Sequence, residues 1–195
     1  LDPEQSFILP EDVVSHARKQ AADNARAARA DWDARFATWQ QANPAGAALL
    51  ERLEAHRLPE GLEEALPTWE VGESLATRAA SGKVLSALAG VVPELWGGSA
   101  DLAGSNNTTM AGEPSFLPAA LAQSEGDGPF GRTLHFGVRE HAMGSILNGI
   151  ALDGLTRPYG GTFMVFSDYM RPAVRLAALM GIGPVFVWSH DSIGV

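Results

Sequence analysis

One stretch of the chain holds an acid and three aromatic residues whose types and spacing suit cofactor chemistry. Glu140 follows one short apolar strand, and Phe163, Phe166 and Tyr169 follow the next. A carboxylate beside aromatic rings can hold a flat nitrogen heterocycle, because it accepts a hydrogen bond from one ring N–H while ring faces stack. Taken singly, Glu140 could serve only a helix dipole, and the aromatic spacing also fits a helical core stripe. Together they predict a cofactor site.

The elements that must position these residues alternate between strands and helices. We expect an α/β domain with a mainly parallel sheet and helices on both faces, because strands separated by helices imply crossover connections. Ser74 is expected to cap the first helix, and Pro172 indicates that the last one either starts near Arg171 or is kinked. The pattern predicts strands at 94–98, 133–136, 158–163 and 184–189, with helices at 74–91, at 140–152 and up to Met180.

Polar residues follow each of the four strands. In open parallel sheets, ligands bind beyond the carboxyl ends of the strands, so these turns should meet at one edge. The turns are 98–106, 137–140, 163–169 and 190–192, and they contain Gly, Ser, Asn, Asp, Glu and His. The sequence therefore predicts one composite site at this edge.

The first part of the chain has helical periodicity and no strand pattern. Apolar or large residues recur in steps of three and four through 11–41, and a second helix is expected at 47–56. Such a stripe fits either a helix docked on a larger body or a partner-binding helix. We divide the chain into a helical segment, 1–72, and an α/β domain, 73–195.

Composition excludes several classes of partner. The formal charge of -9 argues against nucleic acid, because such proteins need Lys and Arg to neutralise phosphates. The chain has no Cys, hence no disulfide, thiolate metal site or Cys nucleophile. Apolar runs fall well short of the roughly 18 residues of a membrane span, and no export signal opens the chain, so we expect a cytoplasmic protein without a membrane partner. Because it starts without Met and stops just after a strand, we expect an internal fragment.

Four motifs carry a resemblance to a known family. They are Gly-Gly-Ser-Ala-Asp-Leu-Ala at 97–103, Gly-Val-Arg-Glu at 137–140, Phe-x-x-Phe-x-x-Tyr at 163–169 and His-Asp-Ser-Ile-Gly at 190–194. In these residues and their order, residues 74–195 resemble transketolase, and the preceding residues resemble the connection out of that family's first, diphosphate-binding domain. The resemblance implies the pyrimidine-binding domain of a thiamine diphosphate enzyme.

The resemblance also implies roles for individual residues. Glu140 would hydrogen-bond a ring nitrogen of the aminopyrimidine and favour the imino tautomer, whose exocyclic nitrogen can take the proton from the thiazolium C2. His190 would hydrogen-bond substrate hydroxyls or the intermediate, so these two are the expected catalytic residues. The other expected residues are Phe163, Phe166 and Tyr169 in the pyrimidine pocket, Asp101 and Leu102 near the cofactor at the subunit boundary, and Arg78 and Ser105 at the sugar phosphate.

Without the resemblance, structural roles stay open for several of these residues. Asp101 could cap its own loop, Arg78 could be an exposed helix charge, and His190 could be a structural residue at a strand end. Gly126-Asp127-Gly128 resembles the start of a thiamine-diphosphate metal signature. It precedes a strand and lacks the required Asn downstream, so we assign it no metal role.

The implied reaction is the transfer of a two-carbon ketol (glycolaldehyde) unit from a ketose phosphate to an aldose phosphate by a thiamine diphosphate ylide, in the pentose phosphate pathway. The resemblance implies that the diphosphate and a Mg or Ca ion are held by another domain, from the other subunit of a homodimer. We therefore expect no metal ligand here and negligible activity of this chain alone. The alternatives are dihydroxyacetone synthase or another thiamine diphosphate enzyme, and, in another class, a non-catalytic subunit-binding module.

Overall fold

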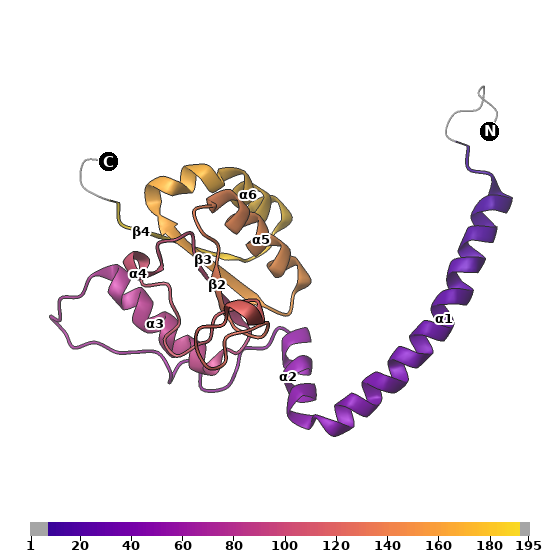
Figure 1. Cartoon of the computed structure of the whole chain (residues 1–195), viewed down its shortest axis with the longest axis horizontal. Helices are drawn as coiled ribbons and strands as arrows, with labels where there is room; N and C mark the ends of the chain where they lie inside the picture. The colour runs from indigo at the N-terminus through magenta and orange to yellow at the C-terminus, as the bar shows by residue number, and fades with distance from the viewer. Residues whose placement is uncertain (1–7, 192–195) are drawn as a thin grey trace. The chain divides into compact units, whose positions relative to one another are not determined.

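The computed structural model describes residues 8–191, so residues 192–194 of the last motif lie outside the described residues. The chain forms two compact units, Leu1–Glu51 and Arg52–Val195, whereas the predicted boundary after residue 72 stays a prediction. Within the described residues, no helix is long and apolar enough to cross a membrane. The elements (Figure 1) are α1 Glu11–Ala42, α2 Pro44–Glu54, α3 Thr77–Val91, β1 Leu95–Ser99, α4 Ala103–Asn106, η1 Ala119–Leu121, β2 Thr133–His135, α5 Glu140–Asp153, β3 Arg157–Phe163, η2 Met164–Phe166, α6 Ser167–Met180 and β4 Val185–Ser189.

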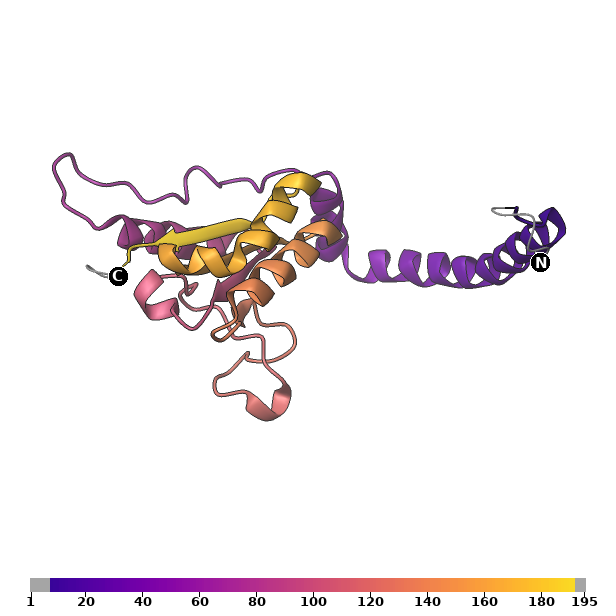
Figure 2. The ribbon, with the colours of Figure 1, turned by 90° about the horizontal axis from the view of Figure 1, so that it is seen from above.

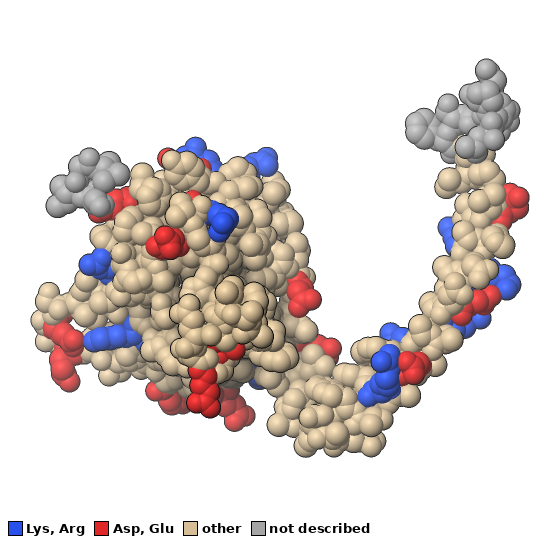
Figure 3. Space-filling view, in the orientation of Figure 1, with Lys and Arg blue, Asp and Glu red and all other residues tan. Residues whose placement is uncertain are grey.

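The long helix α1 of the first unit is held by contacts along its own length. Ion pairs join residues three or four apart, such as Lys19 and Asp23 at 2.7 Å, and Figure 3 shows the two charge types interleaved along the helix. On α1, Trp32, Phe36 and Trp39 stack with ring centroids 4.8 and 5.7 Å apart. The predicted helix is confirmed, and its apolar stripe ends in a row of stacked aromatic rings.

The second unit is built on a four-stranded sheet in the order β2-β1-β3-β4, with every pairing parallel. One row of the register runs across all four strands from Leu134 through Gly98 and Gly160 to Phe186. The predicted parallel sheet is confirmed. Because the strands run in one direction, the turns that follow them all leave the sheet at one edge.

Helices cover both faces of this sheet. A Cβ added to Gly160 would meet Leu147 of α5 at 2.6 Å, whereas one on Gly161 would meet Thr108, just after α4, at 2.7 Å. Successive residues of a strand point to opposite faces, so α5 and α4 lie on opposite sides. Figure 1 shows α6 beside α5 on one side of the strands and α3 with α4 on the other. The predicted arrangement is confirmed.

Each face of the sheet has its own apolar core. Tyr159 of β3 is 1% exposed and donates its hydroxyl hydrogen bond to the Thr108 carbonyl at 2.8 Å. Burial raises the pKa of the Tyr159 hydroxyl, so it stays a donor. The core under α5 and α6 contains Ala100, Leu134, Phe136, Met143, Leu147 and Met170, and the core under α3 contains Ala89, Val92, Leu95, Met110 and Tyr159.

Two expected helix starts differ from the structure. Ser74 does not cap α3: Ala76 precedes its first residue, Thr77, and no side chain caps this end. The connection 55–76 holds no helix or strand and runs as a long segment along the second unit (Figure 2). Ala76 is extended (ψ 136°), which keeps the preceding residues out of the helix.

Pro172 lies inside α6, so of the two alternatives left open by the sequence, a start near Arg171 is wrong. The helix begins at Ser167, directly after the single turn of η2, and continues to Met180. Pro172 has no N–H for the carbonyl of Asp168. Packing offsets this loss: the α6 face that includes Ala173 is buried against α5, and Asn148 Nδ2 donates to the Ala173 carbonyl at 2.8 Å.

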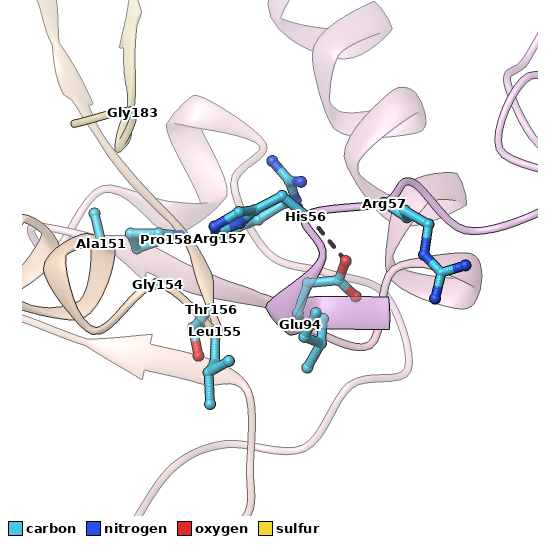
Figure 4. Close-up of a pocket in the computed structure, with 11 residues that line it drawn as sticks. His56, Arg57, Glu94, Ala151, Gly154, Leu155, Thr156, Arg157, Pro158 and Gly183 are labelled. Atoms are coloured by element: carbon cyan, nitrogen blue, oxygen red, sulfur yellow. Dashed lines mark ion pairs between the residues drawn. The ribbon is translucent and has the colours of Figure 1, made fainter. Parts of the chain in front are cut away.

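A buried ion pair lies just before β1, at the amino ends of the strands. Arg52 donates from both Nη atoms to the two Glu94 oxygens at 2.9 and 2.7 Å, and the side chains are 18% and 3% exposed. Arg157 Nε is 3.8 Å from Glu94 Oε1, beside a cavity of about 180 Å³ (Figure 4). Burial acts to raise the pKa of Glu94, but the hydrogen bonds and charge of Arg52 outweigh it and hold that pKa below its ordinary value.

Candidate active site

The carboxyl edge of the sheet brings the expected site residues to two neighbouring cavities. The first has a volume of about 410 Å³ and is lined from three successive strand ends. Polar and aromatic groups meet there on an otherwise apolar wall, as in many ligand sites. Its lining residues are Ala100, Asp101, Leu102, Val138, Glu140, Phe166 and Tyr169.

Glu140 is the buried acid of this first cavity. It is the first residue of α5 and only 8% exposed. Within residues 8–191 its carboxylate has no hydrogen-bond or ion-pair partner, and the neighbouring Arg139 instead donates to the Phe136 carbonyl at 3.0 Å. Because Glu140 lines the cavity, its carboxylate is available to accept a hydrogen bond from a bound ligand.

The aromatic residues form a row from the first cavity to the second. Phe166 and Tyr169 line the first cavity with ring centroids 6.2 Å apart, and Phe163 stacks on Phe166 at 6.1 Å. Phe163 in turn meets the edge of the His190 ring at 5.0 Å. The η2 turn sets this spacing, and Asp191 Oδ1 holds it by accepting from the Val165 N–H at 2.8 Å.

The second cavity, of about 500 Å³, contains a cationic group beside a histidine. Arg78 Nη1 lies 2.6 Å from His190 Nε2 and 3.3 Å from the Ser105 carbonyl oxygen. The same Arg78 Nη1 lies 3.2 Å from His190 Nδ1, and because a guanidinium only donates, the unprotonated nitrogen of the neutral His190 ring is the acceptor. The lining residues are Ala76, Thr77, Arg78, Ser81, Asn106, Val187, Trp188, Ser189 and His190.

The structure thus links every expected site residue into one assembly, although they fall in different cavities. Phe163 and Ser105 line neither cavity. The Phe163 ring contacts those of Phe166 and His190, and the Ser105 carbonyl oxygen is 3.3 Å from Arg78 Nη1. Asp101 has the left-handed backbone angle φ 63°, which suits an Asp in a tight loop, so a structural role for it stays compatible with its place at the cavity.

Sequence reasoning assigned no individual role to three polar residues of this edge: Ser99, Asn106 and Ser189. They are hydrogen-bonded to one another beneath the turns, and Asn106 is fully buried. Ser99 and Asn106 fall within the turn that was recognised as part of the site. Nothing in their spacing distinguishes them from solvent-exposed turn residues, so no sequence signal could have identified them.

Asp127 has a structural role in the loop between α4 and β2, which projects from the second unit (Figure 2). It accepts from the backbone N–H groups of Ser115 at 2.7 Å, Gln123 at 3.1 Å and Ser124 at 2.9 Å. These hydrogen bonds hold the pKa of Asp127 below its ordinary value of 3.8, and the bond from Ser115 has the largest effect. Both carboxylate oxygens are therefore used within the loop.

Replacing Asp127 by Asn is expected to speed amide hydrogen exchange at Ser115 and Ser124, because a neutral amide is the weaker acceptor. Since the pKa of Asp127 is lowered, its stabilisation is present above pH 3.8 and is lost as the pH falls through the folded value. Hydrogen exchange read by NMR between pH 7 and pH 3 measures both effects. Glu125→Gln, an exposed acid of the same loop, is the control, and equal protection in both variants would contradict the prediction.

Comparison with known families agrees with this geometry. The model for the transketolase pyrimidine-binding domain matches residues 73–195, and the model for the transketolase thiamine diphosphate-binding domain matches residues 1–59. The chain belongs to the transketolase family. The predicted family, and with it the pyrimidine-domain fold of the sheet, is confirmed.

Individual transketolases match the whole chain. Transketolase from Mycobacterium bovis is 58% identical over all of this chain and 28% of its own length, and that from Geobacillus stearothermophilus is 49% identical over 98% and 27%. A solved structure of Pichia stipitis transketolase in complex with sedoheptulose 7-phosphate superposes with a TM-score of 0.88, at 41% identity, over 100% of this chain and 28% of that one. The chain thus spans little more than a quarter of the length of these transketolases.

Proposed function

We propose that this chain forms the pyrimidine-binding half of a transketolase active site, which transfers a two-carbon ketol unit from a ketose phosphate to an aldose phosphate. The observation that carries the proposal is Glu140, which is only 8% exposed, lines a cavity beside two aromatic rings and has no side-chain partner within residues 8–191. The match to both transketolase domain models supports it.

The first cavity fits the aminopyrimidine of thiamine diphosphate. When bound, this cofactor supplies a carbon nucleophile that cleaves the ketose and carries the ketol unit. Glu140 accepts a hydrogen bond from the ring N–H of the pyrimidine and stabilises the extra proton there. Phe166 and Tyr169, which line the same cavity, would pack against the bound ring and keep water from it, which would strengthen the Glu140 interaction. Asp101 and Leu102 complete the wall on the side of β1.

The second cavity suits the substrate. Arg78 presents a permanently charged, planar fork that matches a phosphate, and Ser105 lies beside it. His190, whose ring is held by Arg78 and Phe163, is placed to hydrogen-bond substrate hydroxyls. The sugar phosphate in the solved Pichia stipitis transketolase complex supports phosphorylated substrates.

The described residues present no charged cradle for the cofactor's diphosphate, and no group of three potential metal ligands occurs among them. We propose that the diphosphate and a Mg or Ca ion bind on the thiamine diphosphate-binding domain of a second copy, in a homodimer. Exposed Tyr169 and Val138 at the mouth of the first cavity are consistent with such a covering surface. We also assign the enzyme to the cytoplasm, supported by the absence of Cys.

The test is ketol transfer from fructose 6-phosphate to ribose 5-phosphate. The full-length protein that contains this chain is expected to catalyse it only with thiamine diphosphate and Mg present. The 195-residue chain alone is expected to show negligible turnover and weak cofactor binding by calorimetry. Turnover by the isolated chain would contradict the half-site, and a full-length protein that binds a second subunit without any transfer would favour the non-catalytic module.

A further inference from the structure

A line of buried hydrogen bonds runs beneath the turns of the carboxyl edge. Its centre is Asn106, the last residue of α4, which is 0% exposed. Asn106 Oδ1 accepts from Ser189 Oγ at 2.6 Å, and Asn106 Nδ2 donates to Ser99 Oγ at 3.3 Å. Ser99 Oγ then donates to the Gly161 carbonyl at 2.9 Å. The line therefore joins β4, α4, β1 and β3.

Each serine hydroxyl in this line donates one hydrogen bond. The Ser189 hydroxyl donates to Asn106, and the Ser99 hydroxyl donates to the Gly161 carbonyl oxygen, which can only accept. The residue between them must accept at one end and donate at the other. A carboxamide does so, whereas an Asp carboxylate lacks the donor and a Leu side chain lacks both groups.

Two members of the line, Ser189 and Asn106, themselves line the second cavity. Ser189 directly precedes His190 in the chain, and Asn106 directly follows Ser105. Arg78 reaches across to both, at 2.6 Å from His190 Nε2 and 3.3 Å from the Ser105 carbonyl. A change in the separation of α4 and the end of β4 must therefore change the geometry of all three groups around a bound phosphate.

We infer that Asn106 is a positioning residue for sugar-phosphate binding, which sets the spacing of Ser105, Arg78 and His190 by tying α4 to the end of β4. The inference rests on the proposed function, since it concerns the substrate side of the same site. Loss of this tie is predicted to change the affinity for substrate. The affinity for thiamine diphosphate should not change, because Glu140 and Tyr169 lie on α5 and α6.

The test uses Ser189→Ala and Asn106→Leu in the full-length protein. Each is expected to raise the KM for both sugar phosphates by roughly tenfold, because small misplacements of binding groups are costly. We expect kcat to change by less than about threefold and the KM for thiamine diphosphate to stay unchanged. Ser189→Thr keeps the hydroxyl, so it is expected to retain the original KM. If the Ser189 side chain only filled space, KM would not depend on the presence of the hydroxyl.

Thr108→Val is the control, because it also removes one hydroxyl near α4, and the buried Thr108 hydroxyl has no hydrogen-bond partner among the described residues. Calorimetry with inorganic phosphate tests the same spacing without catalysis. The Kd for phosphate should rise in Ser189→Ala and stay unchanged in Thr108→Val. Unchanged KM and Kd in a folded Ser189→Ala variant would overturn the inference. Absence of ketol transfer in the unsubstituted protein would instead overturn the proposed function, leaving the phosphate Kd to decide the role of Asn106.

Discussion

Replacing Glu140 by Gln in the full-length protein is expected to lower kcat for ketol transfer by about 10²–10⁴-fold, the usual range for a positioned acid–base group. Gln keeps the shape and one acceptor, but it carries no charge and cannot stabilise an extra proton on the pyrimidine. The low exposure of Glu140 enlarges the effect, because little water is present to compensate. Steady-state kinetics at saturating thiamine diphosphate measure kcat separately from cofactor affinity.

Asp153→Asn provides the matched control for Glu140→Gln. Asp153 is the last residue of the same helix, is exposed and lies away from both cavities. Its substitution removes the same charge from α5 and should leave kcat within about twofold. If Glu140→Gln kept more than a tenth of the original kcat at saturating cofactor, Glu140 would not act on the pyrimidine as proposed.

Replacing Arg52 by Met is expected to reduce the free energy of unfolding by about 3–5 kcal/mol, the cost of leaving one partner of a buried ion pair uncompensated. Glu94 is 3% exposed, and Arg52 supplies both of its side-chain hydrogen bonds, with Arg157 more distant at 3.8 Å. The double variant Arg52→Met/Glu94→Leu should regain most of the loss, because apolar replacement of a buried pair is often neutral. Urea unfolding at pH 7 measures these differences.

The exposed pair Arg35 and Asp31 on α1 serves as the control, where Arg35→Met should cost less than about 1 kcal/mol. The pH dependence gives a second check. Because the pKa of Glu94 is lowered, its contribution is fully present above its ordinary value of 4.5 and is lost as the pH falls through the folded value. The difference between the original chain and Arg52→Met should therefore shrink in acid. If Arg52→Met lowered the free energy of unfolding by only about 1 kcal/mol at pH 7, the buried ion pair would not be a main contributor to stability.

The strands were predictable because their apolar runs are short, alternate with helical patterns and are bounded by turn residues. All four were placed within about one residue, and the start of α5 at Glu140 was placed correctly. Helix starts that depend on weak local preferences were placed less well. Ser74 has the side chain of a cap but lies outside α3, and α6 passes through Pro172, because packing on α5 outweighs a local penalty.

The convergence of the site was also predictable, since a parallel sheet brings the turns after its strands to one edge. The division into two cavities was not. It depends on where the Phe163 ring lies, between Phe166 on one side and His190 on the other. That placement follows from η2, a single turn whose geometry is held by Asp191 from another strand end.

The sequence by itself determined the class of fold, the family and the set of residues that meet at the carboxyl edge, because periodicity and motif order are properties of neighbouring residues. Only the tertiary structure decided that Glu140 lines a cavity without a side-chain partner within residues 8–191, and that Asn106 joins Ser189 to Ser99. Burial and hydrogen bonding depend on contacts between segments far apart in the chain. Ser189 and Asn106 are 83 residues apart in sequence, so only the folded chain could show that they meet.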